Sequence, residues 1–176
     1  MVLIFYGNVF AESKDRDAKL SQLFEQLKKS NNTSMAFEIE MKIWNIWTTH
    51  PTHDNLTQSL AKGSDLMSKG ELETAYKIFS AIIESDPVWA EGWNKRATVL
   101  YLMGRYQDSL KDINEVLERE SRHFGALSGQ GLIHIEMKNY EKAIKSYEGV
   151  QKIYPSINSA KVMIPQLKKL IKDKAI

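Results

Sequence analysis

The sequence predicts an all-α protein built as a solenoid, that is, a stack of helical hairpins. The first observation is an internal repeat. A shift of 34 residues aligns three consecutive blocks without a gap, at 56–89, 90–123 and 124–157. The second observation is that apolar residues in each block recur with the spacing of two amphipathic helices. Because one hairpin cannot bury its own apolar face, stacking the three makes the core continuous.

The chain begins with an apolar stretch, residues 1–11, which ends in Val9-Phe10-Ala11 and is followed by charged residues. Apolar character and a small final residue are typical of the back half of a secretory signal peptide, although a basic start is missing. We expect residues 1–11 to be a signal-peptide remnant and the protein to be periplasmic or otherwise exported. A cytoplasmic protein with an apolar N-terminus is the alternative. No apolar run reaches the roughly 20 residues that a membrane-spanning helix needs.

Residues 12–55 are predicted to form an N-terminal helical hairpin followed by a loop. The two helices are expected at 15–29 and 33–48, because each segment carries an apolar stripe at helical spacing. The pair has the size of one repeat without its pattern, so we expect it to cap the first repeat.

The loop at 50–55 contains His50, His53 and Asp54, whose side chains are of the metal-binding type. A metal site needs at least one further ligand in a defined geometry, and Pro51 breaks the helix that could align these three. We therefore expect an exposed loop here, and neither a metal nor a cofactor in the protein.

The three blocks share residue types at fixed slots, and glycine, proline and small residues are prominent among them. Small side chains at one slot let the two helices of a hairpin approach closely, and glycine suits the left-handed turn after a helix. Proline ends a helix because the residue before it is pushed out of the α region. The shared residues are Gly63, Ala97 and Gly131; Gly70, Gly104 and Lys138; Ala75, Ser109 and Ala143; Phe79, Ile113 and Tyr147; and Pro87, Ser121 and Pro155.

Residues 158–176 are predicted to form a C-terminal capping helix with lysines on its outer face. Such polar-faced caps keep a solenoid soluble. Pro165 lies inside this helix and removes one backbone hydrogen bond, so we expect a kink or a split there.

Slot by slot, residues 56–157 resemble the tetratricopeptide repeat (TPR), with Lys138 and Ser121 departing from its glycine and proline. The resemblance implies a right-handed α-solenoid that binds a peptide or protein segment and has no catalytic activity. The chain is also similar to TPR proteins of alphaproteobacteria, which share stretches like Ala90–Thr98 and Arg122–Gly131.

The family resemblance also implies where a ligand lies, because particular slots line the concave groove of TPR proteins. That groove would combine apolar and polar groups, which suits an extended or helical segment of an unidentified protein partner. By this mapping the groove residues are Asn94, Thr98, Tyr101, Ser128, Leu132, Ile135, Ser64 and Met67.

Chaperone-binding TPR domains carry a carboxylate clamp of lysine, asparagine and arginine. The corresponding slots here hold Leu60, Ser64, Lys95, Gly125 and Gly129. The clamp is absent, so binding of Hsp70 or Hsp90 tails is not expected.

Composition excludes several other functions. The chain has no cysteine, and its net charge of +2 does not favour a nucleic-acid binder. Neither His123 nor His134 has a nucleophile placed beside it as a catalytic triad requires. The alternative to peptide binding is a self-associating scaffold, with homo-oligomer contacts through Trp44 and Trp47 or through the basic last helix.

Overall fold

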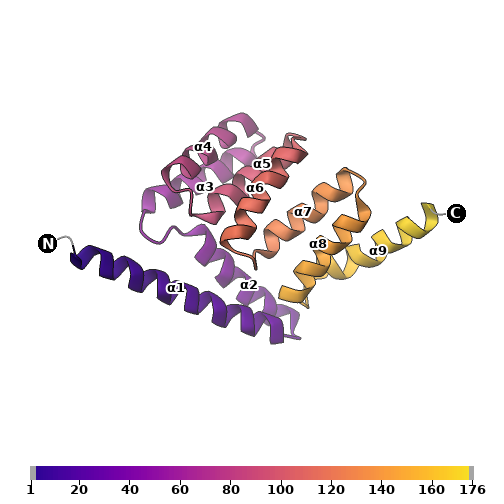
Figure 1. Cartoon of the computed structure of the whole chain (residues 1–176), viewed down its shortest axis with the longest axis horizontal. Helices are drawn as coiled ribbons and strands as arrows, with labels where there is room; N and C mark the ends of the chain where they lie inside the picture. The colour runs from indigo at the N-terminus through magenta and orange to yellow at the C-terminus, as the bar shows by residue number, and fades with distance from the viewer. Residues whose placement is uncertain (1–2, 175–176) are drawn as a thin grey trace.

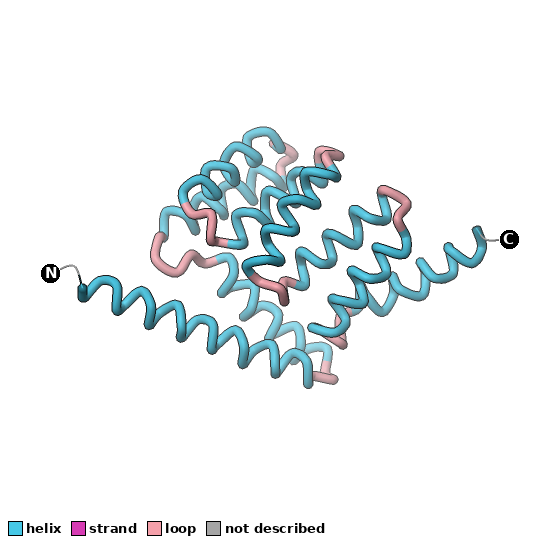
Figure 2. The backbone as a smooth tube through the Cα atoms, in the orientation of Figure 1, coloured by secondary structure: helices cyan, strands magenta, loops and turns pink. Residues whose placement is uncertain are grey.

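The computed structural model describes residues 3–174, with side chains from residue 15 onward. Within these residues the chain forms nine helices and no strand, which confirms the all-α prediction (Figure 1). Short turns join the helices at their ends (Figure 2). The helices are α1 (Leu3–Lys29), α2 (Thr33–Thr48), α3 (Asp54–Ser68), α4 (Leu72–Ser85), α5 (Ala90–Leu102), α6 (Tyr106–Arg119), α7 (Phe124–Glu136), α8 (Tyr140–Ile153) and α9 (Asn158–Lys174).

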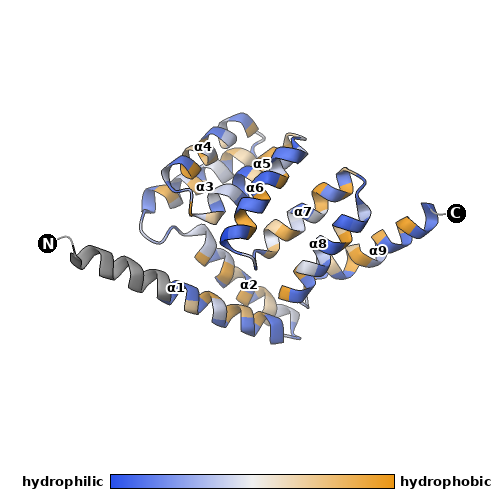
Figure 3. Cartoon of the chain, viewed as in Figure 1, coloured by the Kyte–Doolittle hydropathy of each residue, from blue (hydrophilic) through white to orange (hydrophobic). Residues whose placement is uncertain are grey.

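Helices α3 to α8 form three stacked hairpins, one for each sequence block, and apolar and polar residues alternate along them (Figure 3). In the first and third hairpins a glycine brings the two helices together. A Cβ at Gly63 would lie 2.5 Å from the ring of Phe79, and a Cβ at Gly131 would lie 2.8 Å from the ring of Tyr147. Because no side chain fits there, the small slot of the repeat is the contact point of the two helices.

The first helix of each hairpin ends in the same left-handed turn. Gly70, Gly104 and Lys138 occupy the C′ position with φ values of 80°, 72° and 59°. In the third hairpin the N–H of Asn139 donates to the carbonyl of His134 at 2.7 Å. This is the hydrogen bond from C″ to C3 that defines a Schellman motif. Lys138 therefore keeps the conformation of the glycine that it replaces.

The N-terminal hairpin, α1 and α2, is placed differently from the end cap that the sequence suggested. It lies along the edge of the array, beside the loops that link one hairpin to the next (Figure 1). Residues near the ends of all three blocks bond to it. The indole N–H of Trp89 donates to the carbonyl of Trp47 at 2.9 Å, and the hydroxyl of Tyr154 donates to Glu40 at 3.1 Å. A guanidinium nitrogen of Arg122 donates to the hydroxyl of Ser21 at 3.2 Å.

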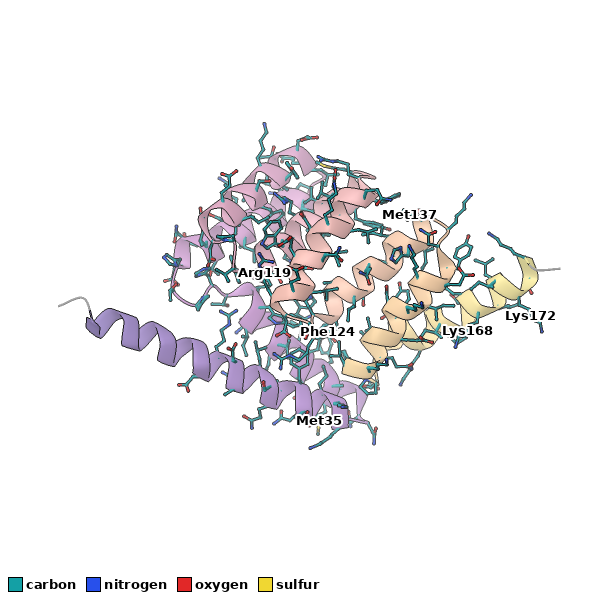
Figure 4. The ribbon with its side chains drawn as sticks, in the orientation of Figure 1. Met35, Arg119, Phe124, Met137, Lys168 and Lys172 are labelled. Atoms are coloured by element: carbon teal, nitrogen blue, oxygen red, sulfur yellow. The ribbon has the colours of Figure 1, made fainter. Side chains whose placement is uncertain are left out.

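A shared apolar core holds the N-terminal hairpin in this place. Phe124 at the start of α7 is 2% exposed and lies where the array meets α2 (Figure 4). Its ring contacts those of Phe24, Trp44, Trp47 and Tyr154 at centroid distances of 5.1–6.4 Å. The buried members of this core are Leu20, Leu23, Phe24, Leu27, Ala36, Ile39, Ile43, Trp47, Phe124, Val150 and Tyr154.

The ends of the chain also differ in part from expectation. The predicted signal-peptide remnant, residues 1–11, lies outside the residues with described side chains, while the backbone of α1 is helical from Leu3. Helix α9 is not split at Pro165. Ile164 and Leu167 on either side of the proline pack into one core with α8, which holds both halves of α9 together. No helix within residues 3–174 is long and apolar enough to cross a bilayer.

Candidate functional site

A hollow of about 300 Å³ lies between α5, α6 and α7. Most of its lining is apolar, and five of the eight residues expected in the groove border it. The residues around the hollow are Asn94, Ala97, Thr98, Tyr101, Leu102, Ser109, Ile113, Gly125, Ala126, Ser128, Gly129, Leu132 and Ile133.

Helix periodicity brings these residues to one surface. Asn94, Thr98 and Tyr101 lie four and three residues apart on α5, and Ser128 and Leu132 lie four apart on α7, so each set shares a helix face. The two faces border the same hollow.

The three remaining groove residues lie elsewhere. Ile135 packs against the apolar core that α8 forms with α9. Met67 packs against the core of the first hairpin. The hydroxyl of Ser64 donates to the carbonyl of Leu60 at 2.8 Å, within its own helix. The hollow is thus limited to the second and third hairpins.

The side chain of Asn94 forms its hydrogen bond within the protein. It is 8% exposed, and its amide nitrogen donates to Glu91 Oε1 at 3.1 Å. The hydroxyl of Thr98 donates to the carbonyl of Asn94 at 3.0 Å, although Thr98 itself is exposed. The apolar side chains therefore offer more free contact surface to a ligand than the amide does. Leu132 is 42% exposed, and Leu102, which the sequence did not single out, is 51% exposed.

A buried hydrogen-bond network lies beside the hollow. Glu91 is 1% exposed and His123 is not exposed at all. The backbone N–H of Ala126 donates to His123 Nδ1 at 3.0 Å, so the ring proton lies on Nε2, which donates to Glu91 Oε2 at 3.2 Å. The imidazole stacks on Trp47 with ring centroids 4.0 Å apart. His123 thus caps α7 and joins α5 to the N-terminal hairpin.

The pKa of Glu91 is lowered by this network. Burial is the largest single influence and by itself raises the pKa. The hydrogen bonds from His123 and Asn94 and the positive charge of Lys95 act in the opposite direction, and on balance the pKa is lowered. Glu91 is therefore a charged group that the fold depends on, with no exposed surface for a substrate.

His50 was expected in an exposed loop and is instead 3% exposed. Its Nδ1 accepts the backbone N–H of His53 at 2.9 Å and of Thr52 at 3.2 Å, and its Nε2 faces Asp86 Oδ2 at 2.7 Å. The imidazole closes the turn before α3, which begins at Asp54 inside the predicted loop. No group of three or more metal-binding side chains occurs among the described residues.

Of the two tryptophans suggested for self-association, Trp47 is buried and Trp44 is half-buried against the same core. Trp47 is 4% exposed. Trp44 fills the space over Gly125, where a Cβ would come within 2.6 Å of its ring. The basic surface of α9 remains exposed, with Lys168 and Lys172 projecting from it (Figure 4).

Comparison with known sequences gives a consistent family. A model described as the tetratricopeptide repeat matches residues 125–157. A TPR repeat-containing protein of Rhizobium etli is 32% identical over 165 residues, which cover 91% of this chain and 80% of that protein. The DnaJ homolog subfamily C member 3 of Bos taurus is 28% identical over 115 residues, which cover 65% of this chain but 23% of that longer protein.

Solved structures share the arrangement of helices. The first TPR of Spaghetti (RPAP3), bound to an HSP90 peptide, has a TM-score of 0.64 and 18% identity, and the match covers 66% of this chain and 93% of that one. The Yersinia enterocolitica type III secretion chaperone SycD, in complex with a peptide of the translocator YopD, has a TM-score of 0.63 and 13% identity. That match covers 68% of this chain and 97% of SycD. At such identities the likeness concerns the fold, and it confirms the solenoid of helical hairpins.

Proposed function

Since the chain belongs to the tetratricopeptide-repeat family, we propose that it is a non-catalytic interaction module that binds a segment of a partner protein. The segment lies on the surface formed by α5 and α7 and uses the apolar hollow between them. The single observation that carries this proposal is that five of the predicted groove residues border one hollow whose lining is mostly apolar.

Two further facts support a binding role. Two solved structures with the same fold contain a bound peptide: the first TPR of RPAP3 binds an HSP90 peptide, and SycD binds a peptide of YopD. In addition, Leu102 and Leu132 leave large apolar side chains exposed at the hollow, and an exposed apolar cluster next to a concavity is typical of an interaction site.

The proposal does not extend to the chaperone tails that some relatives bind. Leu60, Ser64, Gly125 and Gly129 stand at slots where the carboxylate clamp needs charged or amide side chains. The cations that pair with a terminal carboxylate are thus missing at these slots.

The test is a charge placed in the hollow. The Leu132→Glu variant should reduce capture of the partner from a lysate of the source organism by roughly tenfold, because the partner's apolar group would have to desolvate a carboxylate. Captured proteins are identified by mass spectrometry and quantified against the unmodified chain.

Leu170→Glu is the matched control, since Leu170 is a helical leucine on α9 with 37% exposure against 42% for Leu132. Both variants should keep the melting temperature of the parent. Equal capture by the parent and by Leu132→Glu would show that the hollow is not the binding surface. Asn94→Ala is avoided because it would remove one of the hydrogen bonds that the buried Glu91 accepts.

A further inference from the structure

The outer side of α2 is apolar and uncovered. Met35, Phe37 and Met41 are 57%, 58% and 51% exposed, and Figure 4 shows Met35 at an outer edge of the molecule. The remaining sides of α2 are apolar as well. Their buried residues are Ala36, Ile39, Ile43 and Trp47. A helix that is apolar on all sides is normally buried all round, so the outer side of α2 lacks a partner among the described residues.

A recess accompanies these protruding side chains. It has a volume of about 750 Å³ and lies between α1 and α2, with the buried Leu23 in its lining. We call this recess the outer groove. The residues that line it are Lys19, Gln22, Leu23, Gln26, Phe37, Glu38, Met41, Lys42, Asn45 and Ile46. The same hairpin thus offers both large apolar side chains and a space that can receive them, which an interface between two identical copies requires.

The charges along the outer groove are also self-complementary. Phe37 and Met41 lie four residues apart and form one row on the face of α2. Glu38 and Lys42 form the next row, and neither is in an ion pair among the described residues. A partner of one charge sign would repel either Glu38 or Lys42. A second copy turned by a two-fold axis instead presents the opposite charge to each of them.

We propose that two copies of this chain associate through the outer groove, with their α2 helices antiparallel about a two-fold axis. Each row then faces the same row of the second copy, because such an axis keeps both flanks of the helix on their own sides. Phe37 packs against Met41 of the second copy, and Glu38 pairs with Lys42 of the second copy. The two N-terminal hairpins together form a four-helix bundle. This inference is independent of the peptide binding proposed for the surface of α5 and α7.

Light scattering coupled to size-exclusion chromatography tests the arrangement on the full chain. The mass of the parent should approach twice the 20.2 kDa of one chain as its concentration rises. Glu38→Lys places two lysines in the charged row of each copy, and Lys42→Glu places two glutamates there. Each variant should raise the dissociation constant at least about tenfold, because like charges then face each other. An equimolar mixture of the two variants should dimerise again, since every lysine then faces a glutamate.

Lys77→Glu is the matched control for Lys42→Glu. Lys77 is an exposed lysine that follows Glu73 by four residues on α4, across the molecule from α1 and α2 (Figure 1). This variant should dimerise like the parent. Phe37→Ala separates association from folding. It should weaken the dimer, yet in dilute solution, where the copies are apart, it should unfold at the same urea concentration as the parent.

Three results would overturn the inference. The first is a parent chain that stays monomeric at millimolar concentration, as expected if the outer groove receives a different partner. The second is a dimer that neither Glu38→Lys nor Lys42→Glu weakens, because its interface would then lie elsewhere. The third is a mixture of these two variants that stays monomeric. Leu132→Glu should dimerise like the parent whatever its effect on partner capture, so the dimer and the peptide site are tested separately.

Discussion

At the scale of single residues, the site and the fold compete for the same polar groups. Asn94 was expected to bond to a ligand, yet its amide supports Glu91, which in turn accepts from His123. A carboxylate with 1% exposure needs such partners, because an unpaired buried charge is strongly destabilising. The apolar residues around the hollow form no hydrogen bond to a buried charge, so they remain free for binding.

The Glu91 network predicts a dependence of stability on pH. Because the pKa of Glu91 is lower in the folded chain than its ordinary value of 4.5, its contribution is fully present above pH 4.5. The contribution is lost as the pH falls below 4.5 and through the folded pKa.

Glu91→Gln should therefore lower the free energy of unfolding at pH 7 by about 1–3 kcal/mol, the cost of weakening a buried hydrogen-bonded group. The difference between parent and variant should shrink as the pH falls from 4.5 to 3. Urea denaturation followed by circular dichroism at each pH measures it. A difference that stays constant over this range would contradict the assigned role.

At the scale of the elements, the hairpin turns follow local chemistry. All three use a left-handed residue at C′, and the third turn uses Lys138 in place of glycine. An L-residue in this conformation is less favourable than glycine by about 1–2 kcal/mol.

Lys138→Gly should therefore stabilise the protein by up to about 1 kcal/mol, after allowance for the greater freedom of glycine in the unfolded chain. Gly104→Ala should destabilise it by a similar amount, because it introduces the strain that Lys138 already bears. Thermal melting of both variants gives the comparison. The two substitutions should shift the melting temperature in opposite directions. A higher melting temperature for Gly104→Ala would contradict the left-handed strain assigned to this position.

At the scale of the whole molecule, the N-terminal hairpin connects parts that a simple solenoid leaves independent. In a repeat array each hairpin contacts its neighbours alone. Here α1 and α2 bond to residues near the ends of all three blocks, over sequence separations of 42, 101 and 114 residues. These links should make unfolding more cooperative than that of an isolated array.

Phe124→Ala tests this coupling, because the Phe124 ring lies between the hairpin and the array. It should destabilise the protein by about 3–5 kcal/mol, the usual cost of removing a buried aromatic ring. In urea the parent should show coincident transitions by tryptophan fluorescence and by circular dichroism, whereas Phe124→Ala should separate them.

Phe37→Ala is the control, since Phe37 on α2 is 58% exposed and its loss should change stability by less than about 0.5 kcal/mol. Coincident transitions in Phe124→Ala would mean that the hairpin and the array do not unfold separately when their shared core is weakened.

The sequence by itself determined the repeat, the ends of its helices, the left-handed turns and the small contact slots such as Gly63 and Gly131. These features depend on residues within one period of 34, where spacing and the conformational limits of glycine and proline decide the outcome. It also brought Asn94, Thr98, Tyr101, Ser128 and Leu132 to one surface, because helix periodicity and the stacking of repeats place them there.

The tertiary structure alone decided where the N-terminal hairpin lies and which polar groups are buried. His50, expected on an exposed loop, pairs with Asp86, and Trp44 packs over Gly125. These contacts join residues that are far apart in the chain and follow no period, so no local pattern in the sequence predicts them. They depend on which apolar faces are left uncovered after the repeats have stacked, and that is settled by the assembled core.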